Sequence, residues 1–165
     1  MLKITIDVST LINGINSGSS KYTYYILKQL DAASNIKLTL FSYCPIKVYK
    51  HFIRFLESNF KQPKKIIIPI PNKVTNKILL IWQKLNYPPL DYLIKNTDIF
   101  HSFGVYHPPL RKIKGIATIH DLNFLDHPNW TSEANYKLHK KKLKKIEDSC
   151  KYLVVESNST KNEIL

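Results

Sequence analysis

Cysteines are few and long apolar runs are missing in this sequence of 165 residues. Its two cysteines, Cys44 and Cys150, form no close pair, which favours buried thiols in a reducing compartment over disulfides or a metal site. No apolar run approaches the roughly 20 residues that a membrane-spanning helix needs. The first residues lead directly into a strand pattern rather than a secretory signal, so we expect a cytoplasmic protein.

Arginine is almost missing from a strongly basic chain. The formal net charge is +13, yet Arg54 and Arg111 are the only arginines. Planar, bidentate recognition of phosphates and bases favours arginine over lysine. The charge therefore fits diffuse attraction to an anionic surface, and we expect no specific nucleic-acid partner. A global bias toward Lys, Asn and Ile is the alternative explanation.

Strand and helix patterns alternate along the chain. Predicted strands cover residues 2–8, 36–41, 65–68, 98–101, 115–119 and 151–155. Predicted helices lie between them, and this order indicates an α/β fold: a Rossmann-like three-layer domain with a mainly parallel sheet and helices on both faces. Residues 1–165 form one domain in this interpretation. The last predicted helix reaches Leu165 without a stop signal, so we expect the domain to be truncated near its C-terminal end.

Local signals place the ends and faces of several elements. Ser19 or Ser20 is predicted to cap the first helix, Pro69 to stop the third strand, and the segment around Pro128 to form a loop. Tyr22, Tyr25 and Trp82 are predicted to be core residues. The third helix is predicted from an apolar stripe at helical spacing, made of Val74, Ile78, Ile81, Trp82 and Leu85.

Polar side chains stand at the ends of different predicted strands, and ligands of open α/β sheets bind at the carboxyl ends of strands. These side chains are Asp7, His101, His120, Asp121 and Ser157. His120 is suited to general-base chemistry or to binding a sugar hydroxyl or phosphate; capping a strand end is its structural alternative. Asp121 either orients His120 and binds hydroxyls or opens an Asx turn.

Other candidates have simpler structural explanations. Gly18 precedes a helix whose free N–H groups suit a phosphate, although a turn also explains it. Ser157 has the position of a helix cap. The lysine-rich face Lys140–Lys145 is either solvated or a docking patch for anionic lipid. His101, His107 and His120 lack metal-ligand spacing, so no metal is expected. The Walker motif, the G-x-G-x-x-G fingerprint and the nucleophile elbow are absent.

The ordered set of motifs resembles the N-terminal half of glycosyltransferase family 4 enzymes, which have the GT-B fold of two Rossmann-like domains. The matching segments span nearly the whole chain: Ile4–Asp7, Gly18–Thr23, Trp82–Gln83 with Pro88, Asp98–Ser102, Thr118–Leu122 with Pro128, and Ser157–Lys161. The family's loop commonly has glycine where this chain has Ser20 and arginine where it has Lys21. Both departures would weaken a close approach of the backbone to a phosphate.

The resemblance implies a retaining, metal-independent hexosyltransferase that needs no cofactor. It would move a sugar from a nucleotide-sugar to a glycan or lipid-linked acceptor, with His120 and Asp121 at the reacting centre. Substrate-binding positions would be Gly18, Ser20, Lys21, His101 and Ser157. This chain would be the acceptor-side domain, and a C-terminal donor domain would be supplied in cis or by a separate chain.

Two other functions compete with this expectation. The first is a non-catalytic fragment, or a module that binds glycans or anionic membrane. Membrane binding would use Lys140–Lys145 at the inner membrane face. A basic nucleic-acid-binding domain is the second, and the shortage of arginine argues against it.

Overall fold

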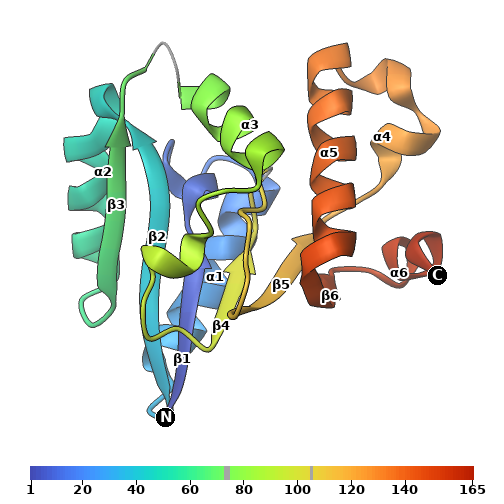
Figure 1. Ribbon diagram of the computed structural model, residues 1–165. Helices are drawn as coiled ribbons and strands as arrows, with labels where there is room; N and C mark the ends of the chain where they lie inside the picture. The colour runs from blue at the N-terminus through green and yellow to red at the C-terminus, as the bar shows by residue number, and fades with distance from the viewer. Residues whose placement is uncertain (73–74, 105) are drawn as a thin grey trace.

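A parallel β-sheet lies at the centre of the protein in this computed structural model, which describes residues 1–72, 75–104 and 106–165 (Figure 1). Within these residues the sheet has six strands in the order β3-β2-β1-β4-β5-β6. The strands are β1 (Leu2–Asp7), β2 (Ile36–Pro45), β3 (Lys64–Ile70), β4 (Ile99–Ser102), β5 (Lys114–Ile119) and β6 (Cys150–Val155). All five pairings are parallel, which confirms the predicted α/β, Rossmann-like fold.

Helices connect the strands and cover the sheet. The α-helices are α1 (Gly18–Ala32), α2 (Ile46–Asn59), α3 (Thr75–Leu85), α4 (Asn123–Asp126), α5 (Glu133–Ser149) and α6 (Asn158–Ile164). Short 3-10 helices are η1 (Ser9–Leu11), η2 (Leu90–Tyr92) and η3 (Pro128–Trp130). Val74, predicted to belong to the stripe of the third helix, lies outside the described residues.

The alternation of side chains along β2 separates the two faces of the sheet. Leu38 and Leu40 join a core cluster with residues of α1 and α2, such as Leu27 and Phe52. Phe41 points the opposite way and packs with Leu90, Ile94 and Phe100, with the half-buried Trp82 of α3 beside them. Because neighbouring residues of a strand face opposite sides, one strand contributes to both cores.

A smaller third cluster fixes the chain around the end of β5. Ala117 and Ile119 of β5 pack with Leu122, with Phe124 of α4 and with Ile146 of α5. The side chain of Ser132 caps α5 by accepting a hydrogen bond from the backbone N–H of Asn135. This packing holds α5 against the end of β5, so α5 contributes to whatever lies at that edge of the sheet.

Several elements differ from the predictions, and β2, for example, continues to Pro45 instead of ending at residue 41. Ser17, rather than Ser19 or Ser20, caps α1. Strand β3 continues through Pro69 to Ile70, because β3 is an edge strand and a proline there need not donate to a neighbour. The predicted loop around Pro128 contains the short helices α4 and η3.

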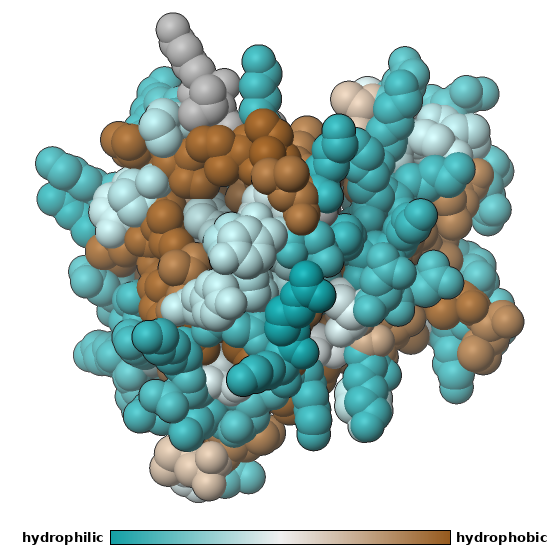
Figure 2. All heavy atoms as spheres, viewed as in Figure 1, coloured by the Kyte–Doolittle hydropathy of each residue, from teal (hydrophilic) through white to brown (hydrophobic). Residues whose placement is uncertain are grey.

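The burial of several aromatic and apolar side chains also differs from the predictions. Tyr25 is 66% exposed and is not a core residue. On α3, Ile78, Ile81 and Leu85 are exposed, and Leu79 is the buried side chain instead. Figure 2 shows apolar atoms gathered over α3 on the surface. Helical spacing identified the amphipathic pattern but could not indicate which side of the helix meets the sheet.

Two leucines test these burial assignments. Leu56 of α2 has no exposed surface, whereas Leu85 at the end of α3 is 66% exposed. We expect Leu56→Ala to lower the free energy of unfolding by about 2 to 5 kcal/mol, because it leaves a cavity in the core. Leu85→Ala should change it by less than about 0.5 kcal/mol. Urea unfolding of both variants would measure this, and equal losses would contradict the orientation of α3.

Candidate functional site

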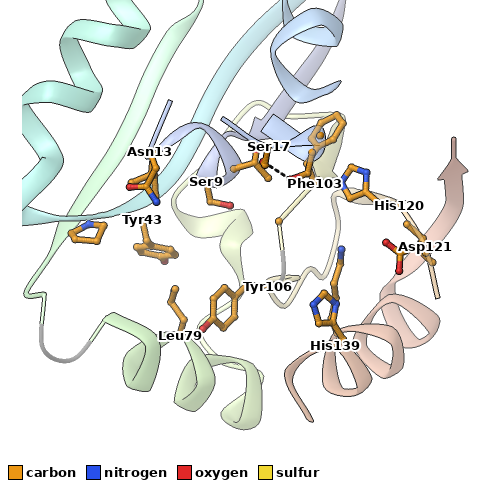
Figure 3. A pocket seen from close by; sticks show the side chains of 18 of the residues that line it. Ser9, Asn13, Ser17, Tyr43, Leu79, Phe103, Tyr106, His120, Asp121 and His139 are labelled. Atoms are coloured by element: carbon orange, nitrogen blue, oxygen red, sulfur yellow. Dashed lines mark hydrogen bonds between the residues drawn. The ribbon is translucent and has the colours of Figure 1, made fainter. Parts of the chain in front are cut away.

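A cleft of about 990 Å³ lies at the edge of the sheet where the strands end. Its walls come from the segments that follow β1, β2, β4 and β5, from the first turn of α1, and from α3 and α5. Figure 3 shows His120, Asp121 and His139 on one side of the cleft and Asn13 and Tyr43 on the other. The carboxyl-end position is the one that parallel sheets of this kind use for ligands.

The buried carboxylate of Asp7, the last residue of β1, joins two loops beside the cleft. One oxygen, Oδ1, accepts a hydrogen bond from the backbone N–H of Ser9 at 2.9 Å. The other, Oδ2, accepts one from the Ser9 hydroxyl at 2.9 Å and one from the backbone N–H of Gly104 at 3.3 Å. Burial raises the pKa of Asp7, and these hydrogen bonds oppose the rise.

His120, which follows β5, is oriented by Glu156. Its Nδ1 lies 2.5 Å from Oε1 of Glu156, and the ring meets Tyr22 edge-on with centroids 5.7 Å apart. An ionised carboxylate only accepts hydrogen bonds, so Glu156 favours the proton on Nδ1. The opposite nitrogen, Nε2, is buried and has no hydrogen-bond partner among the described residues. Such an atom needs a partner from water or from a ligand.

Two further predicted site residues, Asp121 and Gly18, line the same cleft. Asp121 is exposed, and its Oδ1 accepts a hydrogen bond from the N–H of Asn123 in the predicted Asx turn. Gly18 is the first residue of α1, and a Cβ added there would have no neighbouring atom within 4 Å. The structure therefore brings Gly18, His120 and Asp121 together, with the backbone at Gly18 open to a ligand.

The other four predicted residues do not line the cleft. Ser20 is buried and forms a capping box with Ser17. Its hydroxyl is therefore not exposed to a ligand in the cleft. Lys21 is exposed on α1. The Ser157 hydroxyl caps α6 by accepting from the N–H of Thr160 at 3.0 Å, as the structural alternative predicted. His101 lies in β4 and is described next.

Two histidines lie in β4 and in the segment that follows it. His101 stacks on Phe103, and its Nε2 lies 2.9 Å from the Thr118 hydroxyl. Burial lowers the pKa of His101 to about 4, with repulsion from Lys142 as a second cause. His107 has no exposed surface, and burial, with repulsion from Lys142 and Lys145, lowers its pKa to about 3. Both rings are neutral near pH 7.

Sequence reasoning missed three residues of this site: Lys142, Glu156 and Gly104. Lys142 was assigned to the lysine-rich face Lys140–Lys145, but it is 7% exposed and lines the cleft. Its ammonium group donates to the carbonyl oxygen of Thr118 at 3.3 Å. Lys142 lies four residues before the buried Ile146, so the helical spacing of apolar residues carried the signal that it faces inward.

Within the described residues, no group of three His, Cys, Asp or Glu side chains is placed to hold a metal ion. No helix in that part of the chain has the length and apolar character needed to cross a membrane. Comparison with known proteins gives no match: no protein-family profile, no curated protein sequence and no solved structure matches the chain.

The lowered pKa of His101 predicts acid sensitivity. Below pH 6.5 the unfolded chain protonates this ring, whereas the folded chain does so only near pH 4. The contribution of neutral His101 to the free energy of unfolding is therefore complete above pH 6.5. It falls by roughly 3 kcal/mol as the pH drops toward 4. His101→Gln should flatten this part of the stability profile, measured by urea unfolding. The exposed His51→Gln should not, and parallel profiles for wild type and His101→Gln would refute the assignment.

Substitution by alanine should affect stability at only one of two glycines that line the cleft. A Cβ at Gly104 would lie 2.4 Å from Oγ of Ser9 and 2.8 Å from Oδ2 of Asp7, whereas Gly18 has open space. We expect Gly104→Ala to lower the free energy of unfolding by about 1 to 3 kcal/mol. Gly18→Ala should change it by less than about 1 kcal/mol. Thermal unfolding would measure both, and an unharmed Gly104→Ala would mean that the loops are not tightly joined.

Proposed function

We propose that this chain is the acceptor-side domain of a retaining, metal-independent glycosyltransferase that uses a nucleotide-sugar donor. The observation that carries the proposal is the His120–Glu156 pair at the ends of β5 and β6, whose buried Nε2 has no hydrogen-bond partner among the described residues and belongs to a side chain that lines the cleft. Its support from the sequence is the ordered set of motifs similar to glycosyltransferase family 4. The Rossmann-like fold agrees with one half of a GT-B enzyme.

The cleft offers groups suited to a sugar. His120 Nε2 is a hydrogen-bond acceptor for a sugar hydroxyl when Nδ1 donates to Glu156. Hydroxyl and amide side chains of Ser9, Thr10 and Asn13 line the facing wall. Sugars present many hydroxyls that both donate and accept, so a wall of such side chains can bind them without a formal charge.

The transfer itself needs a second domain. It forms a bond between an acceptor oxygen and the anomeric carbon, breaks the bond from that carbon to the diphosphate, and lets the acceptor proton leave with the diphosphate. In this proposal a C-terminal donor domain, in cis or on a separate chain, holds the nucleotide and completes the cleft. The acceptor is a glycan or a lipid-linked sugar, and the histidine side of the cleft contacts the transferred sugar.

Exposed lysines outside the cleft favour a second candidate function. Lys140, Lys141 and Lys144 are exposed on α5 and form a basic surface. Such a surface suits attraction to anionic lipid headgroups. In this alternative the chain is a non-catalytic module that binds glycans or anionic membrane.

Sugar binding by wild type and His120→Ala tests the leading proposal. A panel of nucleotide-sugars and oligosaccharides would be titrated against isotope-labelled protein by nuclear magnetic resonance. We expect ligand-induced shifts at Gly18, His120 and Glu156. His120→Ala should weaken binding about tenfold, the equivalent of one lost hydrogen bond of roughly 1.4 kcal/mol. His51→Ala, which changes an exposed histidine of α2, is the matched control.

Activity measurements give the contradicting outcomes. The isolated 165-residue chain should show little or no transfer, because it presents half of a cleft. Robust turnover by the pure chain would show that no donor domain is needed. Binding to vesicles of anionic lipid with no response to any sugar would favour the membrane-binding module.

A further inference from the structure

Lys142 is a buried cation without a direct counter-ion. Its side chain is 7% exposed, and the one hydrogen bond it makes among the described residues goes to the neutral carbonyl of Thr118. No carboxylate forms an ion pair with it in that part of the chain. Asp7 acts on it electrostatically, but the Asp7 oxygens are bound by Ser9 and Gly104. A charge buried in this way is costly unless another group pairs with it.

The cleft supplies the place for such a group. Lys142 lines it together with Gly104 and with Gly18 and Ser19 at the start of α1. Helix α1 spans 15 residues and its first N–H groups carry partial positive charge, so that wall of the cleft also favours an anion. The two carboxylates that line the cleft are already engaged, since Glu156 holds His120 and Asp121 binds the N–H of Asn123.

We propose that Lys142 binds a phosphate group of the ligand that occupies this cleft. The inference rests on the proposed function and deepens it, because it assigns a phosphate-bearing substrate to this domain's own cleft. Lysine binds phosphate as a compact point charge. The source of the phosphate is either a nucleoside diphosphate or a lipid-linked diphosphate, and both present the same diphosphate chemistry to Lys142.

Binding of the anion should depend on pH through Lys142. Burial lowers the pKa of Lys142 to about 8, so its ammonium is charged below pH 8 and neutral above it. The groups that act electrostatically on Lys142 are Asp7, His101, His107 and Cys150 from other segments and His139 from its own helix. The three imidazoles have lowered pKa values and are neutral above pH 7, and burial raises the pKa of Cys150 to about 11. Asp7 is the remaining ionisable group.

Calorimetric titration with inorganic pyrophosphate tests the site directly. We expect Lys142→Met to weaken pyrophosphate binding at least about tenfold at pH 7. Lys144→Met removes the same charge from an exposed position of the same helix and should change binding less than about twofold. Circular dichroism of both variants would verify folding. Equal affinities for wild type and Lys142→Met would overturn the proposal.

A second measurement needs no variant. Sulfate stays fully ionised across this range, so loss of its binding to wild type between pH 7 and about 9.5 would report on the protein alone. Nuclear magnetic resonance of the Lys142 Cε would follow the pKa, which sulfate should raise above its value of about 8. An unchanged Lys142 pKa would overturn the proposal.

Two diphosphates separate the sources of the phosphate. Uridine diphosphate binding tighter than pyrophosphate would assign the site to the donor, and farnesyl diphosphate binding tighter would assign it to a lipid-linked acceptor. Either result supports the proposal if Lys142→Met also loses binding of the diphosphate. Lys142-dependent pyrophosphate binding without any sugar binding would keep the phosphate site and reject the glycosyltransferase function. Sugar binding without any Lys142-dependent anion binding would reject the phosphate site and keep the glycosyltransferase proposal.

Discussion

The geometry of the cleft depends on the buried carboxylate of Asp7. It accepts hydrogen bonds from Ser9, just beyond β1, and from Gly104, beyond β4 and 97 residues away in sequence. The parallel pairing of β1 with β4 brings these two loops side by side. Only a residue without a Cβ lets the Gly104 backbone approach the carboxylate this closely. The floor beneath the cleft is therefore fixed by strand pairing and by one glycine.

Around this floor, polar side chains divide into two groups with different chemistry. On the side of β5 and β6, Glu156 orients the His120 ring and leaves one ring nitrogen without a partner in the described structure. Lys142 enters from α5 as a buried cation that pairs with no carboxylate among the residues that the structure describes. The proposals assign a sugar hydroxyl to His120 and a phosphate to Lys142, and both side chains line the same cleft.

Much of the framework was predictable from local patterns. Period-two alternation predicted β1 and a short apolar run with β-branched residues predicted β5, and the order of predicted strands and helices predicted the parallel sheet. The polar residues His120 and Asp121 were predicted at the end of β5, where they are found. Burial was predicted less well: Tyr25 and Leu85 are exposed, because a helix's apolar stripe is wider than the part that its neighbours cover.

The sequence by itself determined which elements form and that His120 and Asp121 stand at a strand end, because these properties follow from short-range periodicity. Only the tertiary structure decided which side chains meet. Glu156 is 36 residues from His120 in sequence, and the pairing of β5 with β6 brings them together. Lys142 belongs to a lysine-rich run, and helical spacing places it on the side of Ile146, but only the packing of α5 against β5 buries it beside the cleft. Contacts between distant segments leave no mark in local composition.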